Sequence, residues 1–258
     1  MENSSDEQIR AFLEEKVQLY NRKEFIPSDP IQVPHLFHRK EDIEIAAFFT
    51  ATIAWGQRIT IISNARRLLE MMPGGPYHFI STHCEEDLDP FLSFVHRTFN
   101  GLDLVFFLKA LKHIYTQYQD LESVFEHGFR KEGNVFGALS HFRRVFFKET
   151  SPGATGRHVS DVTRGSAAKR LNMFLRWMVR KDISEVDFGI WTAIPTSALM
   201  IPLDVHSAST ARKLGLLTRK QNDWKAVEEL TINLRRFDPL DPVKYDYALF
   251  GLGVFEKF

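Results

Sequence analysis

The chain has almost no cysteine, because Cys84 is the single one among its 258 residues. One cysteine excludes an internal disulfide framework and any four-cysteine zinc or iron–sulfur site within the chain. Such scarcity is typical of a reducing compartment, and we therefore expect a cytoplasmic protein. Long apolar runs are missing as well, since none reaches the roughly 18 residues that a membrane-spanning helix requires. The sequence thus predicts a protein with no membrane partner.

The chain also lacks a net charge, since 33 lysines and arginines balance 33 aspartates and glutamates. A balanced protein does not coat nucleic acid through bulk charge alone. The distribution is uneven, however, because the window from Arg130 to Lys181 holds twelve basic residues and three acidic ones. That window is a candidate phosphate-binding surface, and solvated helix faces are the alternative interpretation.

Several signatures of hydrolytic and metal chemistry are absent. The sequence contains neither a phosphate-cradling P-loop nor a Gly-x-Ser-x-Gly nucleophile turn, so nucleotide hydrolysis and esterase chemistry have no support in it. Its ten histidines form no helix-spaced pair accompanied by acids. We therefore expect no catalytic metal and no other cofactor.

The sequence is rich in apolar residues at helical spacing. Hydrophobic residues make up 44% of the chain, with 23 phenylalanines, which fits a packed globular protein. No alternating pattern is long enough to require a sheet. We predict an all-α fold, either as one large domain or as two lobes sharing a groove. The helical pattern covers 42–72, with a break at Trp55-Gly56-Gln57-Arg58, and recurs at 103–118, 135–147, 166–181, 223–237 and 242–255.

A basic helix and a capped helix follow one another in the last third of the chain. The predicted helix 166–181 places apolar residues on one face. On another face it carries Lys169, Arg176 and Arg180, which we expect to present cations to solvent. Two prolines then enforce an extended link, and Asp204 is expected to cap the helix that follows.

These features carry a resemblance to known proteins. Lys169 opens a basic helix, an extended link follows, and Pro202-Leu203-Asp204 precedes a helix reading Ala211-Arg212-Lys213-Leu214-Gly215-Leu216. This order resembles the helix-hairpin-helix DNA glycosylase superfamily, and most closely its archaeal 8-oxoguanine glycosylase branch. A second likeness covers nearly the whole chain, because residues 169–180 and 186–191 are similar to an uncharacterised bacterial family of about this length.

The glycosylase resemblance implies a two-lobed helical bundle with a central cleft, one lobe being approximately residues 1–40 plus 150–258 and the other 41–149. It also implies a base-excision DNA glycosylase with AP-lyase chemistry, acting on duplex DNA that contains a damaged or abasic nucleotide. In that superfamily a helix lysine attacks the sugar C1′ of a flipped nucleotide, while an aspartate assists proton transfer and stabilises the positive sugar. Lys169 and Asp204 match these roles in order and local context. A solvated lysine and an ordinary N-cap are the alternatives.

Other residues are candidates for contacting the nucleic acid. The resemblance places Gln57 in a turn that enters the gap left by the flipped base, with Arg58 on a phosphate. Arg164 and Ser166, just before the basic helix, could hold another phosphate. An ordinary turn is the alternative for residues 55–58.

Further candidates follow from the predicted position of the site. Arg176 belongs to the expected cationic face, and Trp177 and Trp191 could stack on an extruded base. His206 could bind a phosphate or a polar base edge. A place in the apolar core is the alternative for the tryptophans, and an incidental position is the alternative for the histidine.

The chain departs from the superfamily in one respect. The glycine-rich hairpin that presents backbone N–H groups to DNA phosphate is not recognisable before Lys169, where Val162-Thr163-Arg164-Gly165-Ser166 stands instead. This departure favours an alternative function, a non-catalytic module on the same scaffold that binds nucleic acid or protein. The sequence specifies neither the damaged base nor the oligomeric state.

Overall fold

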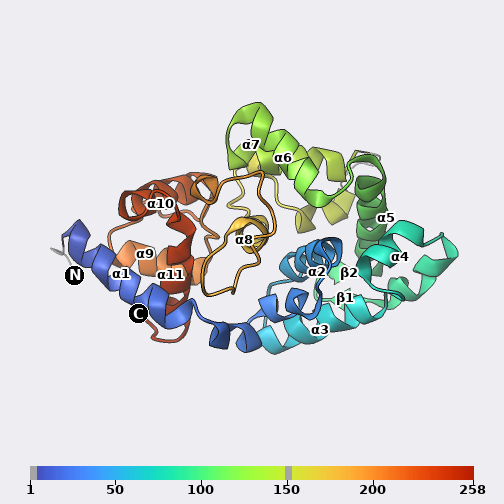
Figure 1. Cartoon of the computed structure of the whole chain (residues 1–258), viewed down its shortest axis with the longest axis horizontal. Helices are drawn as coiled ribbons and strands as arrows, with labels where there is room; N and C mark the ends of the chain where they lie inside the picture. The colour runs from blue at the N-terminus through green and yellow to red at the C-terminus, as the bar shows by residue number, and fades with distance from the viewer. Residues whose placement is uncertain (1–4, 149–152) are drawn as a thin grey trace. The chain divides into compact units, whose positions relative to one another are not determined.

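A computed structural model of the protein describes residues 5–148 and 153–258. Over these residues the fold is all-α apart from one short antiparallel hairpin, which confirms the predicted class (Figure 1). None of the helices in the described ranges is both long and apolar enough to cross a membrane. The α-helices are α1 (Asp6–Tyr20), α2 (Lys40–Thr52), α3 (Arg58–Glu70), α4 (Pro76–Thr82), α5 (Gly101–Gln117), α6 (Leu121–Glu132), α7 (Val135–Phe146), α8 (Lys169–Val179), α9 (Val205–Lys213), α10 (Trp224–Phe237) and α11 (Tyr245–Val254).

Short elements connect these helices. The hairpin pairs β1 (Val95–His96) with β2 (Phe99–Asn100). The 3₁₀ helices are η1 (Lys23–Ser28), η2 (Pro30–Gln32), η3 (Pro34–Leu36), η4 (Glu86–Ser93), η5 (Gly153–His158), η6 (Val162–Arg164), η7 (Thr196–Ala198) and η8 (Pro242–Lys244).

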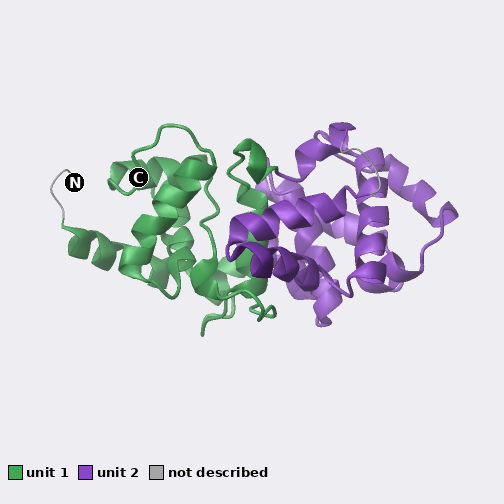
Figure 2. Cartoon of the chain, turned by 90° about the horizontal axis from the view of Figure 1, so that it is seen from above, with its two compact units in different colours: residues 1–26, 161–258 green, residues 27–160 purple. Residues whose placement is uncertain are grey.

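The chain divides into two compact units, coloured separately in Figure 2. Unit 1 comprises residues 1–26 and 161–258, and unit 2 comprises residues 27–160. The first boundary therefore lies at residue 26 where the sequence suggested 40, and the second lies at 160 where it suggested 149. Residues 27–36, which form short proline-containing 3₁₀ turns, belong to unit 2.

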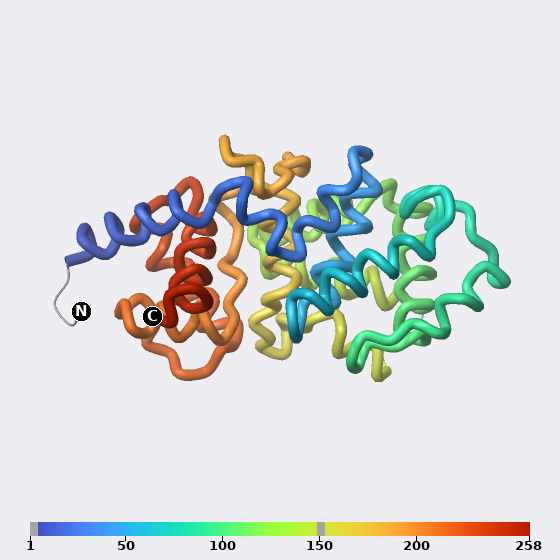
Figure 3. The backbone as a smooth tube through the Cα atoms, turned by 90° about the horizontal axis from the view of Figure 1, so that it is seen from below, coloured from blue at the N-terminus to red at the C-terminus, as the bar shows by residue number. Residues whose placement is uncertain are grey.

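Unit 1 is built from both ends of the chain. A capping box at Ser5 starts α1, whose buried residues Ile9, Leu13 and Val17 recur at the four-residue spacing of one helix face. That face packs against α11, which in turn packs against α9 (Figure 3). Gly251 of α11 permits this close approach, because the ring of Tyr20 occupies the space where a β-carbon would lie.

Unit 2 has an aromatic core centred on α2. Residues 43–52 of this helix are all buried, in keeping with a helix surrounded by other elements. Phe48 stacks on Phe107 of α5 with ring centroids 5.8 Å apart, and Phe107 meets the edge of Phe146 of α7 at 4.7 Å. The helical pattern of residues 42–72 is split between α2 and α3, with a turn at residues 53–57 as the sequence indicated.

Candidate functional site

Lys169 and Asp204 meet within unit 1. Lys169 is the first residue of α8, and Asp204 is the N-cap of α9. The Lys169 Nζ atom lies 3.9 Å from Asp204 Oδ2, with the two side chains 30% and 21% exposed. An amine and a carboxylate thus lie together at the starts of two helices, where solvent can reach both.

The direction of the Asp204 carboxylate is set by its own helix. Asp204 Oδ1 accepts a hydrogen bond from the backbone N–H of Ser207 at 2.8 Å. The other carboxylate oxygen, Oδ2, is the one that lies near Lys169 Nζ. The preceding link is anchored too, because Ile201 is fully buried and its N–H donates to Thr231 Oγ1 of α10 at 3.1 Å. Capping and a chemical role for Asp204 are therefore compatible.

Substitution of Asp204 separates these two roles. Asparagine caps helices about as well as aspartate, so Asp204→Asn is expected to change the free energy of unfolding by only a few tenths of a kcal/mol. Asp204→Ala removes the cap and is expected to cost about 1 kcal/mol. Urea unfolding of both variants measures this difference. Equal losses of stability in the two variants would contradict the capping geometry.

Asp246, a residue that the sequence did not single out, belongs to the same region. It lies in the first turn of α11, is 7% exposed, and accepts a hydrogen bond from Arg176 of α8. Burial raises the pKa of the Asp246 carboxyl to about 6; the charges of Asp204 and Asp187 add to this, and those of Arg176 and Lys169 oppose it. A second carboxylate is thus electrostatically coupled to the Lys169–Asp204 pair.

The raised pKa of Asp246 predicts a pH-dependent stability. The unfolded chain releases this proton near the ordinary value of 3.8, whereas the folded protein keeps it up to about 6. The stabilising contribution is therefore fully present below pH 4 and is lost as the pH rises through 6. Between pH 4 and 7 we expect the free energy of unfolding to fall by up to about 3 kcal/mol more in the wild type than in Asp246→Asn. Urea unfolding across this range tests it, and parallel curves for the two proteins would contradict it.

The cationic face predicted for α8 is wrong for Arg176 and Arg180, which are 5% and 1% exposed. Both guanidinium groups bond to the fully buried carboxylate of Asp187, Arg176 Nε at 3.2 Å and Arg180 Nη1 at 3.0 Å. Arg176 also pairs with Asp246 and lies 4.3 Å from the ring centroid of Tyr247. Because the side chain of Arg176 is enclosed in this way, it is a structural residue and not a solvent-facing ligand for DNA.

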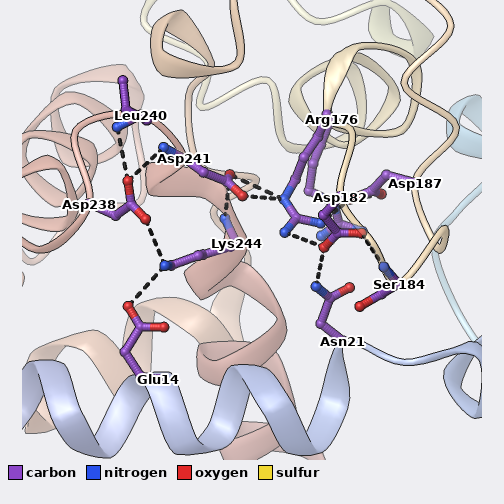
Figure 4. A network of polar contacts seen from close by, with 11 residues as sticks. Glu14, Asn21, Arg176, Asp182, Ser184, Asp187, Asp238, Leu240, Asp241 and Lys244 are labelled. Atoms are coloured by element: carbon purple, nitrogen blue, oxygen red, sulfur yellow. Dashed lines mark hydrogen bonds and ion pairs between the residues drawn. The ribbon is translucent and has the colours of Figure 1, made fainter.

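The buried charge network continues from α8 to other segments of unit 1, as Figure 4 shows. Arg180 Nη2 donates to Asp182 at 2.7 Å, and its Nε donates to both carboxylate oxygens of Asp241 at 3.1 and 2.9 Å. Asp241 accepts the N–H of Lys244, whose Nζ lies 2.9 Å from Glu14 of α1. These contacts join the end of α8 to α1 and to the connection before α11.

Trp177 and Trp191 are core residues, with exposed fractions of 0% and 2%. Trp191 meets the edge of Phe174 with ring centroids 5.3 Å apart. Base stacking requires an accessible ring face, so the role considered for Trp177 and Trp191 is incompatible with their burial. The apolar spacing of α8 decides the place of Trp177, which lies between buried neighbours on that helix.

The remaining candidates of unit 1 are exposed or partly exposed. Arg164 is 88% exposed at its side chain and lies 3.8 Å from Asp161. Ser166 Oγ accepts the N–H of Ala168 at 3.2 Å, just before α8 begins. His206 is exposed in the first turn of α9. All three lie close in sequence to the helix starts that carry Lys169 and Asp204.

Gln57 and Arg58 belong to unit 2, whereas Lys169 and Asp204 belong to unit 1. Gln57 is exposed at the N-cap of α3, and its side chain makes no capping hydrogen bond there. The turn before it depends on Gly56, whose φ of +103° disfavours other residues. The glutamine is therefore presented to solvent at a helix start.

The predicted basic window from Arg130 to Lys181 does not form one solvated surface. The boundary between the units at residues 160 and 161 divides it. Arg176 and Arg180 are buried, and Arg143 donates to the backbone carbonyl groups of Gly156 and Val159. A charge count along the sequence did not distinguish these internal cations from exposed ones.

One acidic cluster has the spacing of metal ligands. Among the described residues, Glu44, Asp120 and Glu122 of unit 2 could present carboxylate oxygens within 4.8 Å of one another. The Nζ atom of Lys40 lies 3.7, 3.0 and 2.6 Å from these three side chains, and Tyr115 donates to Glu44 at 2.8 Å. A lysine cation contacts all three carboxylates, which is the arrangement of a structural ion-pair network.

Comparisons with known proteins identify a family but no activity. No curated protein and no solved structure matches the chain. One family model, described as a protein of unknown function (DUF2400), matches residues 29–255, and the chain belongs to this family.

Proposed function

We propose that the protein is a base-excision DNA glycosylase with AP-lyase chemistry, built on the helix-hairpin-helix glycosylase architecture. One observation carries the proposal: the amine of Lys169 and the carboxylate of Asp204 lie 3.9 Å apart at two helix starts. These are the two residues that the glycosylase resemblance assigns to nucleophile and proton acceptor. Their partner is duplex DNA with a damaged or abasic nucleotide.

The chemistry requires a neutral amine and a nearby base. The Lys169 nitrogen attacks C1′ of a flipped nucleotide, and the glycosidic bond breaks with its electron pair leaving on the base, which takes up a proton. Asp204 accepts the proton released from the attacking nitrogen, and its carboxylate faces the positive charge that develops on the sugar. The C1′–O4′ bond of the sugar then breaks, its electron pair goes to O4′, and O4′ takes up the proton held by Asp204, which leaves an iminium between Lys169 and C1′. Loss of a C2′ proton to a base then permits elimination of the 3′ phosphate.

The surroundings of the pair suit a phosphate-bearing substrate. The α8 terminus has no side-chain cap hydrogen bond, and the partial positive charge at a helix start attracts anions. Arg164, Ser166 and His206 are available near these termini to contact phosphates. Gln57 and Arg58, both in unit 2, belong to the proposal as well. Gln57 would fill the gap left by the flipped base, and Arg58 would contact a phosphate.

Borohydride trapping tests the enzyme directly. The protein is incubated with duplexes that carry oxidised bases or an abasic site, and any imine to the DNA is reduced to a stable adduct. We expect a covalent protein–DNA adduct with at least one damaged duplex, together with release of its base where one is present. The absence of adduct and base release across the whole panel would overturn the proposal.

A non-catalytic binding module is the second candidate, and one observation favours it. Before Lys169 the chain forms one 3₁₀ turn, η6, followed by Gly165. The superfamily has at this place a glycine-rich hairpin that binds DNA phosphate, and the chain lacks a recognisable one. A DNA affinity that depends on salt and survives substitution of both Lys169 and Asp204, without any base release, would support this function instead.

A further inference from the structure

Three segments of unit 2 are joined around one tryptophan. The ring of Trp55, in the turn before Gln57, stacks on His158 of η5 with ring centroids 5.8 Å apart, and it meets His96 of β1 edge-on at 4.9 Å. His96 also contacts the carbonyl oxygen of Trp55 through Nε2 at 3.2 Å, and Asn64 of α3 through Nδ1 at 2.9 Å. The turn, the hairpin and η5 therefore form one local platform.

Buried polar contacts fix η5 within this platform. His158 Nε2 lies 3.2 Å from Asp103 Oδ2 of α5, and both side chains are almost fully buried. Thr155 Oγ1 donates to the other oxygen of Asp103 at 2.7 Å. Arg143 of α7 donates to the carbonyl group of Gly156 at 3.0 Å. Because α5 and α7 both hold η5, residues at its surface have a defined direction.

Three exposed arginines gather around the hairpin of this platform. Arg97 lies at the hairpin turn with a φ of +56°, and its guanidinium lies over Gly56, where a β-carbon would approach Arg97 Nη1 to 2.8 Å. Arg157 Nη2 donates to the carbonyl oxygen of Thr98 at 3.0 Å. Arg67 Nη2 donates to the carbonyl oxygen of Val95 at 3.3 Å.

The Arg67 and Arg157 guanidinium groups donate to backbone carbonyls of the hairpin, and Arg157 Nε also donates to His158 Nε2 at 3.2 Å, so these contacts orient both groups. The segments that form the surface of the platform, 53–58, 94–100 and 153–158, contain no aspartate or glutamate. Asp103 lies beneath them, but it is only 3% exposed. These three segments therefore carry cations and no acid, although the whole chain has no net charge.

We propose that Arg67, Arg97 and Arg157 form a contact surface for the phosphates of a duplex DNA backbone, beside the Gly56–Gln57 turn. We call these residues the hairpin arginines. The inference rests on the proposed function and adds to it three residues that would contact the DNA backbone. A guanidinium presents two parallel N–H groups that match two phosphate oxygens, and three such groups on a fixed platform can follow successive phosphates. In this position they would hold the backbone next to the glutamine proposed as the plug.

The salt dependence of DNA affinity tests the surface. Affinity for a duplex with an abasic analogue is measured over a range of salt concentrations for the full chain and for an Arg97→Ala, Arg157→Ala double variant. Removing one arginine–phosphate interaction lowers the slope of log K against log salt by about 0.9, so we expect a decrease of roughly 1.8 for the double variant. Relative to 1 M salt, affinity near 0.1 M should fall by roughly 60-fold in the double variant compared with the wild type. A lysine double variant, with Arg97→Lys and Arg157→Lys, should retain most of the slope.

A charge-matched control removes two cations elsewhere in unit 2. Lys109 pairs with Glu85 at 2.6 Å and Arg130 pairs with Glu126 at 2.5 Å, so a Lys109→Ala, Arg130→Ala variant should keep the slope. An unchanged slope in the hairpin variant, or an equal change in the control, would overturn the inference even when Lys169 is trapped on DNA. A decrease seen with single-stranded DNA alone would overturn the duplex assignment. No DNA binding or trapping by the wild type would overturn the proposed function itself.

Discussion

Lys169→Gln is expected to abolish covalent trapping on DNA while leaving the fold intact. The variant lacks the amine that forms the bond to C1′, so adduct formation should fall by on the order of 10³-fold or more. The stability cost should be small, within about 0.5 kcal/mol, because the amine lies 3.9 Å from Asp204, beyond hydrogen-bond distance, and the side chain is 30% exposed. Trapping yield and urea unfolding of the same preparation measure the two effects.

Lys181→Gln is the matched control for this experiment. Lys181 is exposed just after the opposite end of α8, so its replacement removes the same charge from the same part of the chain. Trapping by Lys181→Gln should equal that of the wild type. Undiminished trapping in Lys169→Gln would show that another amine is the nucleophile.

Asp187→Ala is expected to produce the largest loss of stability. The Asp187 carboxylate is fully buried and accepts hydrogen bonds from both Arg176 and Arg180. Its removal leaves two buried guanidinium groups with fewer partners, and breaking a buried ion pair in this way costs about 3–5 kcal/mol. Because Arg176 also holds Asp246, the region behind Lys169 should loosen as well.

The free energy of unfolding in urea, followed by far-UV circular dichroism, measures the cost of Asp187→Ala. Glu24→Ala is a suitable comparison, because Glu24 lies 3.8 Å from Arg22 and both side chains are more than half exposed. An exposed pair of this kind contributes at most about 1 kcal/mol. A loss in Asp187→Ala no larger than that in Glu24→Ala would contradict the structural role of the network.

Local rules predicted the helical class and the position of Asp204. Apolar spacing identified most of the longer helices but not α4 or α6, and the glycine-containing turn separated α2 from α3. The N-cap role of Asp204 followed from a short polar side chain after an extended link and before a helix. Each of these features depends on residues close together in the sequence. The contact between Lys169 and Asp204 agrees with the order of the two motifs, and their chemical role stays a prediction.

Long-range partners could not be read from the sequence. Arg176 and Arg180 share a polar register on the helical wheel, yet carboxylates of Asp187, Asp241 and Asp246 enclose them. A charged residue can be buried when its partners come from distant segments, and periodicity does not reveal those partners. One signal did exist: Asp246 is a lone acid among apolar and aromatic residues at the start of α11. Such a residue is a candidate for a buried, paired carboxylate.

The most direct test is to identify which lysine forms the adduct. The wild type is trapped on damaged duplexes with borohydride, the adduct is digested with protease and nuclease, and the modified peptide is located by mass spectrometry. The proposed function predicts that the nucleotide remnant is attached to Lys169. An adduct on a different lysine, or no adduct with any damaged duplex, would contradict it.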